Sequence, residues 1–103
     1  MDMPDTDRLD PRRRRMLYRA SHRGTYENDL MVGGFVRRHI HEMSDAELDA
    51  LEAVMAFPDV ELADWLTGRK PIPAEADSPM LRRLRDAAAD AAQFMSRERL
   101  NNL

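Results

Sequence analysis

Apolar residues recur every three or four positions along most of this chain, which is the spacing of a helix with one buried face. The most regular run lies near the C-terminus and consists of Leu81, Leu84, Ala88, Ala91 and Met95. The same spacing predicts helices over residues 11–23, 27–41, 44–57, 59–68 and 78–96. No stretch shows the strict alternation of apolar and polar residues that is typical of a strand. The chain is therefore predicted to be all-α, a compact bundle of five helices.

Cap signals mark the ends of these helices. The expected N-cap residues are Asp10, Ser44, Asp59 and Ser78. Glu47 follows Ser44 by three positions, so the two residues match a capping box, in which each side chain accepts a hydrogen bond from the backbone N–H of the other. Gly68 is expected to end the fourth helix, because glycine readily adopts the left-handed conformation that often follows a helix.

Three residues inside the helices carry expectations about packing. Gly33 and Gly34 each cost the second helix about 1 kcal/mol relative to alanine, so both are expected to allow another helix to approach closely. A phosphate-binding role is disfavoured, because no strand precedes the pair and no further glycine follows it at the required spacing. Trp65 is the single tryptophan and is expected in the core.

The length of 103 residues predicts a single domain with a modest core. Residues 1–10 are polar, acidic and aperiodic, so a disordered tail is expected there. The helical domain is expected to span residues 11–96, and residues 97–103 are expected to fray at the end of the last helix.

Charge is distributed unevenly along the chain. The 16 Lys and Arg and 19 Asp and Glu give a formal net charge of −3, which argues against a dedicated nucleic-acid binder. Six arginines fall within residues 12–23, whereas residues 42–68 hold eight carboxylates and no Lys or Arg. The molecule is therefore expected to have a basic end and an acidic flank.

Several functional classes lack the residues they need. Without cysteine the chain has no disulfide, thiolate metal site or cysteine nucleophile. No apolar run approaches the roughly 20 residues of a membrane span, and the N-terminus has four aspartates where a signal peptide needs basic residues, so a cytoplasmic location is expected. His39 and His41 do not face one another on a helix and His22 has no partner four positions away, so no metal site is expected.

The stretch from Arg23 to Glu27 separates the first two predicted helices. Gly24 adopts a positive φ without strain, which predicts a tight corner between them. Arg23 then lies at the end of one helix and Glu27 at the start of the next, where each charge suits the helix dipole. Both side chains are expected to point outward, towards a partner protein. The alternative is that they pair with each other at positions i and i+4, which contributes little to stability on a surface.

At this corner the chain resembles the SdhE family and its mitochondrial counterparts, whose signature is Arg-Gly-x-x-Glu. Arg23, Gly24 and Glu27 match that signature, and the likeness covers roughly residues 11–85. Other matching segments are Asp29-Leu30, residues 59–66 and residues 68–73. Many members have Arg in place of Tyr26 and an apolar residue in place of Asn28, so recognition near the signature is expected to differ in detail.

The resemblance implies an assembly factor that is not itself an enzyme. It would bind the flavoprotein subunit of succinate dehydrogenase, with that of fumarate reductase as a second candidate, and promote covalent attachment of FAD to the partner's own histidine. The helical domain is expected to be a monomer. No motif in the chain supports FAD binding of its own, so FAD is expected to be held by the partner and not stably by this chain. The implied partner-binding residues are Arg23, Gly24, Glu27, Asp29, Arg19 and Tyr26. An antitoxin-type role and a nucleic-acid-binding module remain as alternatives.

Overall fold

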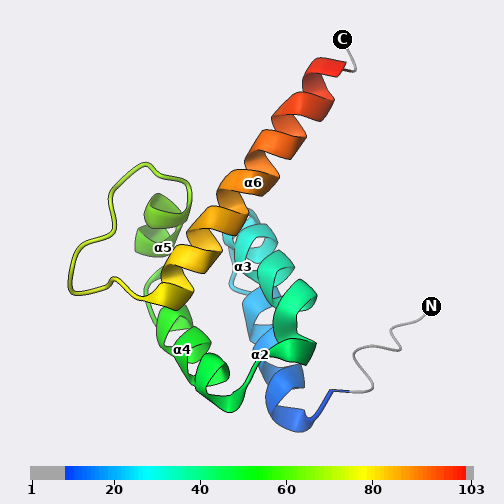
Figure 1. Ribbon diagram of the computed structural model, residues 1–103, viewed down its shortest axis with the longest axis vertical. Helices are drawn as coiled ribbons and strands as arrows, with labels where there is room; N and C mark the ends of the chain where they lie inside the picture. Colours follow the sequence, from blue (N-terminus) through cyan, green and yellow to red (C-terminus); the bar gives the residue numbers. More distant parts are fainter. Residues whose placement is uncertain (1–8, 102–103) are drawn as a thin grey trace.

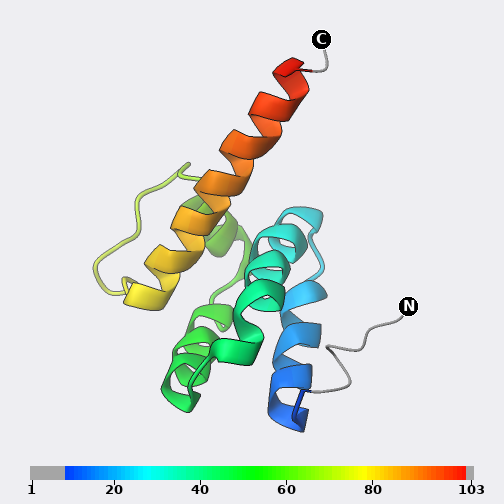
Figure 2. The same cartoon turned by 45° about the vertical axis from the view of Figure 1, so that its right-hand side comes forward.

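The computed structural model describes residues 9–101, with side chains described for residues 9–91. Its helices are α2 (Pro11–Ser21), α3 (Tyr26–His39), η1 (Ile40–Glu42, a 3₁₀ turn), α4 (Asp45–Met55), α5 (Asp59–Leu66) and α6 (Pro79–Asn101). The described residues contain five α-helices and no strand, so the predicted all-α fold is confirmed. The helices α2 and α3 lie side by side and antiparallel, and α6 packs against α3, α4 and α5 (Figure 1, Figure 2).

The two expected tails are described only in part. Residues 1–8 lie outside the described residues, whereas Leu9 is buried against the core. At the other end, α6 continues to Asn101 and extends beyond the other helices in both views (Figure 1, Figure 2). The fraying of residues 97–103 stays a prediction, and residues 102–103 lie outside the described part.

Two of the four expected caps form as predicted. The Ser44 hydroxyl accepts from the Glu47 N–H at 3.1 Å and the Glu47 carboxylate accepts from the Ser44 N–H at 2.9 Å, which completes the capping box. The Ser78 hydroxyl accepts from the Leu81 N–H at 3.1 Å at the start of α6. Local sequence alone is sufficient for these caps, because both partners lie within one helical turn.

The predicted N-cap position is confirmed for Asp10 and wrong for Asp59, and each carboxylate accepts a hydrogen bond from an arginine. Asp10 occupies the N-cap position of α2, but its side chain makes no capping hydrogen bond and accepts from Arg13 Nη1 at 2.8 Å. Pro58 is the N-cap of α5, and Asp59 is the first helical residue. The carboxylate of Asp59 accepts from Arg23 of the corner before α3 instead.

The core lies where all five α-helices meet. Its most deeply buried apolar side chains are Val32, Val36, Ile40, Leu48, Leu51, Val54, Leu62, Leu66, Leu81 and Leu84. Trp65 is buried among them, as predicted, and meets Phe57 edge-on with 5.0 Å between the ring centroids. This core fixes α3 against α5 and α6, and so holds the corner before α3 in place.

The two glycines of α3 differ in their packing. A Cβ added at Gly33 would lie 3.0 Å from Ser21 Oγ, 3.1 Å from Ser21 Cα and 3.3 Å from Ala20 O, so Gly33 allows α2 to approach closely, as predicted. A Cβ added at Gly34 would meet nothing within 4 Å. The prediction of a close approach is therefore wrong for Gly34.

This difference predicts opposite effects of two neighbouring substitutions. Gly34→Ala should raise the free energy of unfolding by up to about 1 kcal/mol, because alanine is the better helix former and has space. Gly33→Ala should lower it by roughly 1–3 kcal/mol, because backbone atoms of α2 must move. Urea denaturation of both variants beside the parent chain measures both values. Changes of the same sign would contradict the packing described here.

Candidate functional site

The corner between α2 and α3 is built by two backbone features. Gly24 has φ of 105°, the positive value that the sequence predicted, and it turns the chain between the helices. Thr25 is the N-cap of α3 and its hydroxyl accepts from the Asn28 N–H at 3.3 Å. Threonine is among the residues favoured at an N-cap, so this cap could have been predicted from the sequence.

Arg23 does not point outward, and that prediction is wrong. Its side chain is only 10% exposed. The guanidinium donates to Asp59 Oδ1 at 2.7 Å, to Met55 O at 2.8 Å and to Phe57 O at 3.0 Å. The last carbonyls of a helix have no partner within it, so the end of α4 and the loop after it attract the five-donor guanidinium inward.

Asn28 completes a partly buried polar cluster of Arg23, Asn28 and Asp59. It is fully buried on α3, and its amide donates to Asp59 O at 2.9 Å and to Asp59 Oδ1 at 3.3 Å. Its own Oδ1 has no hydrogen-bond partner in the structure. The cluster therefore ties the α2–α3 corner to the junction between α4 and α5. Of its three members, the sequence predicted only Arg23 as a site residue and missed Asn28 and Asp59.

Asp29 also serves the corner from within the fold. It is half-buried, and its Oδ1 accepts from the Arg23 backbone N–H at 2.6 Å. This hydrogen bond closes the turn around Gly24 from the α3 side. Arg23 and Asp29 together hold the corner rigid, with most of their polar atoms already engaged.

Glu27 is exposed at the start of α3, as predicted, with a side chain that is 46% exposed. Its carboxylate accepts from Arg69 Nη2 at 3.3 Å, and Arg69 also donates to Asp64 at 3.0 Å. The hydrogen bonds to Asp64 and Glu27 raise the pKa of Arg69 above its ordinary value. The alternative pairing of Arg23 with Glu27 does not occur, because each charge has a different partner.

Tyr26 and Leu30 are large side chains that α3 exposes to solvent. Tyr26 is 81% exposed, and more than half of Leu30 is exposed. Both line a hollow of about 600 Å³ together with Glu27, the end of α5 and the alanines of α6. An exposed apolar surface of this kind, rimmed by charges, is typical of a protein–protein contact.

Arg19 lies on the other side of the corner, towards α4. Its side chain is exposed and reaches Glu52 at 3.9 Å. It lines a second hollow of about 280 Å³ with Tyr18, His22, Arg23 and Asp59. Of the six predicted site residues, Gly24, Tyr26, Glu27 and Arg19 are thus on the surface around the corner, and Arg23 and Asp29 support it from inside.

Over the described part of the chain, no three or more His, Asp or Glu side chains are gathered in a way that could hold a metal ion. None of the described helices combines the length and the apolar composition that a membrane span requires.

Comparison with known proteins identifies the family. The model of the family described as "Flavinator of succinate dehydrogenase" matches residues 14–88, which include the whole corner. The chain belongs to this family. The resemblance inferred from Arg23, Gly24 and Glu27 is therefore confirmed.

Individual relatives of the family agree with this assignment. The chain is 50% identical to the FAD assembly factor SdhE of Acetobacter pasteurianus over 76% of its own length and 72% of that protein. It is 38% identical to the FAD assembly factor SdhE of Ralstonia nicotianae, over 71% of this chain and 77% of the other. The mitochondrial succinate dehydrogenase assembly factor 2 of Mycosarcoma maydis is 36% identical over 68% of this chain, which spans only 29% of that longer protein. No solved structure matches the chain.

Proposed function

We propose that this chain is an assembly factor that binds the flavoprotein subunit of succinate dehydrogenase and promotes covalent attachment of FAD to it. The observation that carries the proposal is the family match over residues 14–88, with the signature glycine and glutamate on the surface of a rigid corner. The flavoprotein subunit of fumarate reductase is a second partner of the same kind. In this proposal the chain acts as a monomer and FAD remains on the flavoprotein throughout.

The corner is suited to docking. Nothing lies within 4 Å of the position that a Cβ of Gly24 would occupy, so a partner backbone has room to approach there. Among the side chains that the structure describes, the carboxylate of Glu27 is paired only with the exposed Arg69, and such a surface pair contributes at most about 1 kcal/mol. Exchanging Arg69 for an arginine or N–H group of the partner therefore costs little.

The factor would act by positioning two groups of the flavoprotein, its histidine and its flavin. By stabilising the flavoprotein conformation in which its histidine lies against the flavin, the factor would raise the rate of a reaction between two groups that both belong to the partner. In this mechanism Arg23 and Asp29 make no contact with the partner. They keep Gly24, Tyr26 and Glu27 in the conformation that the partner binds.

Glu27→Ala tests this role with little effect on the fold. The free energy of unfolding should change by less than about 1 kcal/mol, since an exposed ion pair is lost. The rate of flavin attachment should fall by about tenfold or more, because a charge-assisted hydrogen bond to a partner is worth about 1.5–3 kcal/mol. Covalent flavin on the purified flavoprotein, followed by in-gel fluorescence, gives the rate, and thermal melts give the stability.

Arg69→Ala is the matched control, because it breaks the same ion pair from the other side. If Glu27 acts on the partner, Arg69→Ala should leave flavin attachment within about twofold of the parent chain. Equal losses in the two variants would show that the pair itself matters and would argue against a direct contact from Glu27.

A further inference from the structure

Four arginines lack a partner within the described part of the chain. Arg14 and Arg15 on α2 and Arg37 and Arg38 on α3 are all exposed. Between residues 9 and 91, every other Lys or Arg has a carboxylate oxygen within 4.0 Å, and these four have none. Their charges are therefore not used by the fold that the structure describes.

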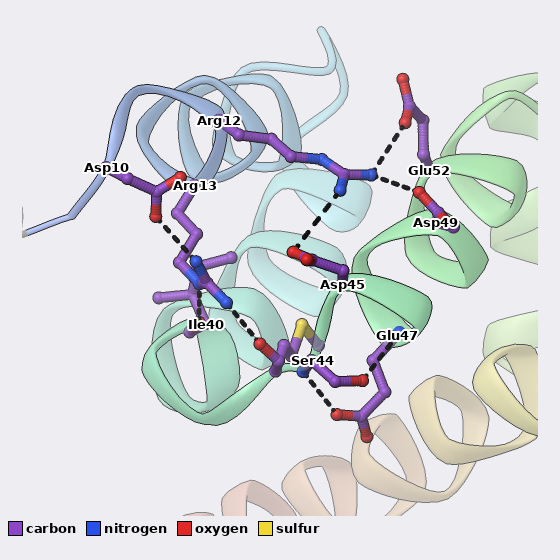
Figure 3. Close-up of polar contacts among 10 residues, drawn as sticks. Asp10, Arg12, Arg13, Ile40, Ser44, Asp45, Glu47, Asp49 and Glu52 are labelled. Atoms are coloured by element: carbon purple, nitrogen blue, oxygen red, sulfur yellow. Dashed lines mark hydrogen bonds and ion pairs between the residues drawn. The ribbon is translucent and has the colours of Figure 1, made fainter.

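The four arginines lie at the same end of the α2–α3 pair. Arg13 donates from Nε to Ile40 O at 3.0 Å and from Nη2 to Met43 O, which fastens the start of α2 beside the end of α3. Figure 3 shows that Arg13 reaches the turn after α3, while Arg12 reaches the acidic side chains of α4. The first two arginines of the run are thus engaged by the fold, and the next two are left on the surface of α2.

The outer face of α2 continues from these arginines to the corner. Tyr18 follows Arg14 by four positions, so the two share one face of α2, and His22 lies just after the end of the helix. Tyr18 is 64% exposed, and its ring stacks on His22 with 4.1 Å between centroids. His22 is separated from Gly24 by one residue. We call the surface formed by Arg14, Arg15, Arg37, Arg38, Tyr18 and His22 the basic strip.

Arg14 and Arg15 are placed unfavourably for their helix, whereas Arg37 and Arg38 lie in the last turn of α3, where cations suit the helix dipole. The first turn of α2 contains no acidic residue, and cations near the positive end of a helix dipole are unfavourable. Arg14 and Arg15 also adjoin Arg12 and Arg13, which adds like charges at short range. A surface with these unfavourable terms and no internal counter-charge is complementary to an external acidic surface.

We propose that the basic strip binds an acidic surface of the flavoprotein and steers the association that brings the corner into place. The inference rests on the proposed function. A protein surface fits better than a bilayer, because Met16 and Ala20 of α2 are buried and Tyr18 is the one large apolar side chain that the strip exposes, too little for an apolar face that enters lipid. It also fits better than nucleic acid, because the acidic row of α4 beside Arg12 repels a polyanion, whereas a folded partner can present a different charge to each region.

The association rate constant with the purified apo-flavoprotein tests the proposal. It is measured by stopped-flow at low and at high ionic strength, for the parent chain and for Arg14→Gln/Arg15→Gln and Arg37→Gln/Arg38→Gln. Each double variant should associate about tenfold more slowly at low salt, because steering raises on-rates by 10-fold or more. The difference should shrink to less than about twofold near 0.5 M salt, where the Debye length is only a few ångströms. The dissociation rate should change little.

Arg82→Gln/Arg83→Gln is the control. It removes the same charge from exposed arginines of α6 that pair with Asp77 and Glu47, and its association rate should stay within about twofold of the parent chain. If the strip variants associate at the same rate as the parent chain or as this control, the inference is overturned. The proposed function would remain intact in that case.

Two other outcomes would also overturn it. Binding of the parent chain to phosphatidylserine vesicles or duplex DNA, lost in the strip variants while their association with the flavoprotein stays normal, would assign the strip to that surface. Absence of binding between the flavoprotein and every chain, the control included, would remove the proposed function and the inference together.

Discussion

Arg23→Ala should lower the free energy of unfolding by about 3 kcal/mol, a large share of the stability of a domain of this size. The substitution removes one donor group from three acceptors at once, namely Asp59 Oδ1, Met55 O and Phe57 O. Asp59 is only 30% exposed, so its charge would remain partly desolvated without a counter-ion. Losing one partner of a buried pair is costly for this reason, even where the intact pair contributes little.

Two companion variants separate the charge from its geometry. Arg23→Lys keeps the positive charge but lacks the planar fork that serves three acceptors, so its loss should be smaller than that of Arg23→Ala. Arg19→Ala removes a nearby exposed arginine with only a 3.9 Å contact to Glu52 and should change stability by less than about 1 kcal/mol. Urea denaturation measures all three. A change below about 1 kcal/mol for Arg23→Ala would mean that the buried contacts do not hold the corner.

The behaviour of Arg23 shows where sequence reasoning stops. The helices, the capping box of α4, the Ser78 cap of α6 and the positive φ of Gly24 depend on residues within one or two turns, and all were predicted. The direction of Arg23 depends on acceptors 32 to 36 positions away in the chain. The dipoles of the two flanking helices alone favour an outward Arg23. The carbonyls at the end of α4, which draw its side chain inward, cannot be located from the local sequence.

The partners of the acceptors Asp59 and Glu27 also could not be predicted from the local sequence. Asp59 stands in a sequence that suits an N-cap, but a capping hydrogen bond is weak beside an ion pair with a buried guanidinium. Glu27 is paired with Arg69, which lies 42 positions away and beyond α5. The family signature pointed to the corner that carries the proposed function, whereas the division of its residues between surface and support required the structure.

Gly24→Val should reduce flavin attachment by at least about tenfold with only a moderate loss of stability. The φ of 105° is unfavourable for a residue with a Cβ and should cost roughly 1–3 kcal/mol. No neighbouring atom lies within 4 Å of the added Cβ, so the chain itself offers no clash. A branched side chain at this point would instead occupy the space through which the partner backbone approaches.

Gly68→Val separates strain from docking. Gly68 has φ of 81° and equally open space around a Cβ, at the end of α5. It should lose a similar amount of stability, roughly 1–3 kcal/mol, from the same backbone strain. Flavin attachment is measured with each variant at equal folded concentration, as judged from its own melting curve. If only Gly24→Val slows attachment, the partner must approach the corner itself. Because Gly68 lines the hollow beside Tyr26 and Glu27, an equal defect in Gly68→Val would show that the effect is not specific to the corner.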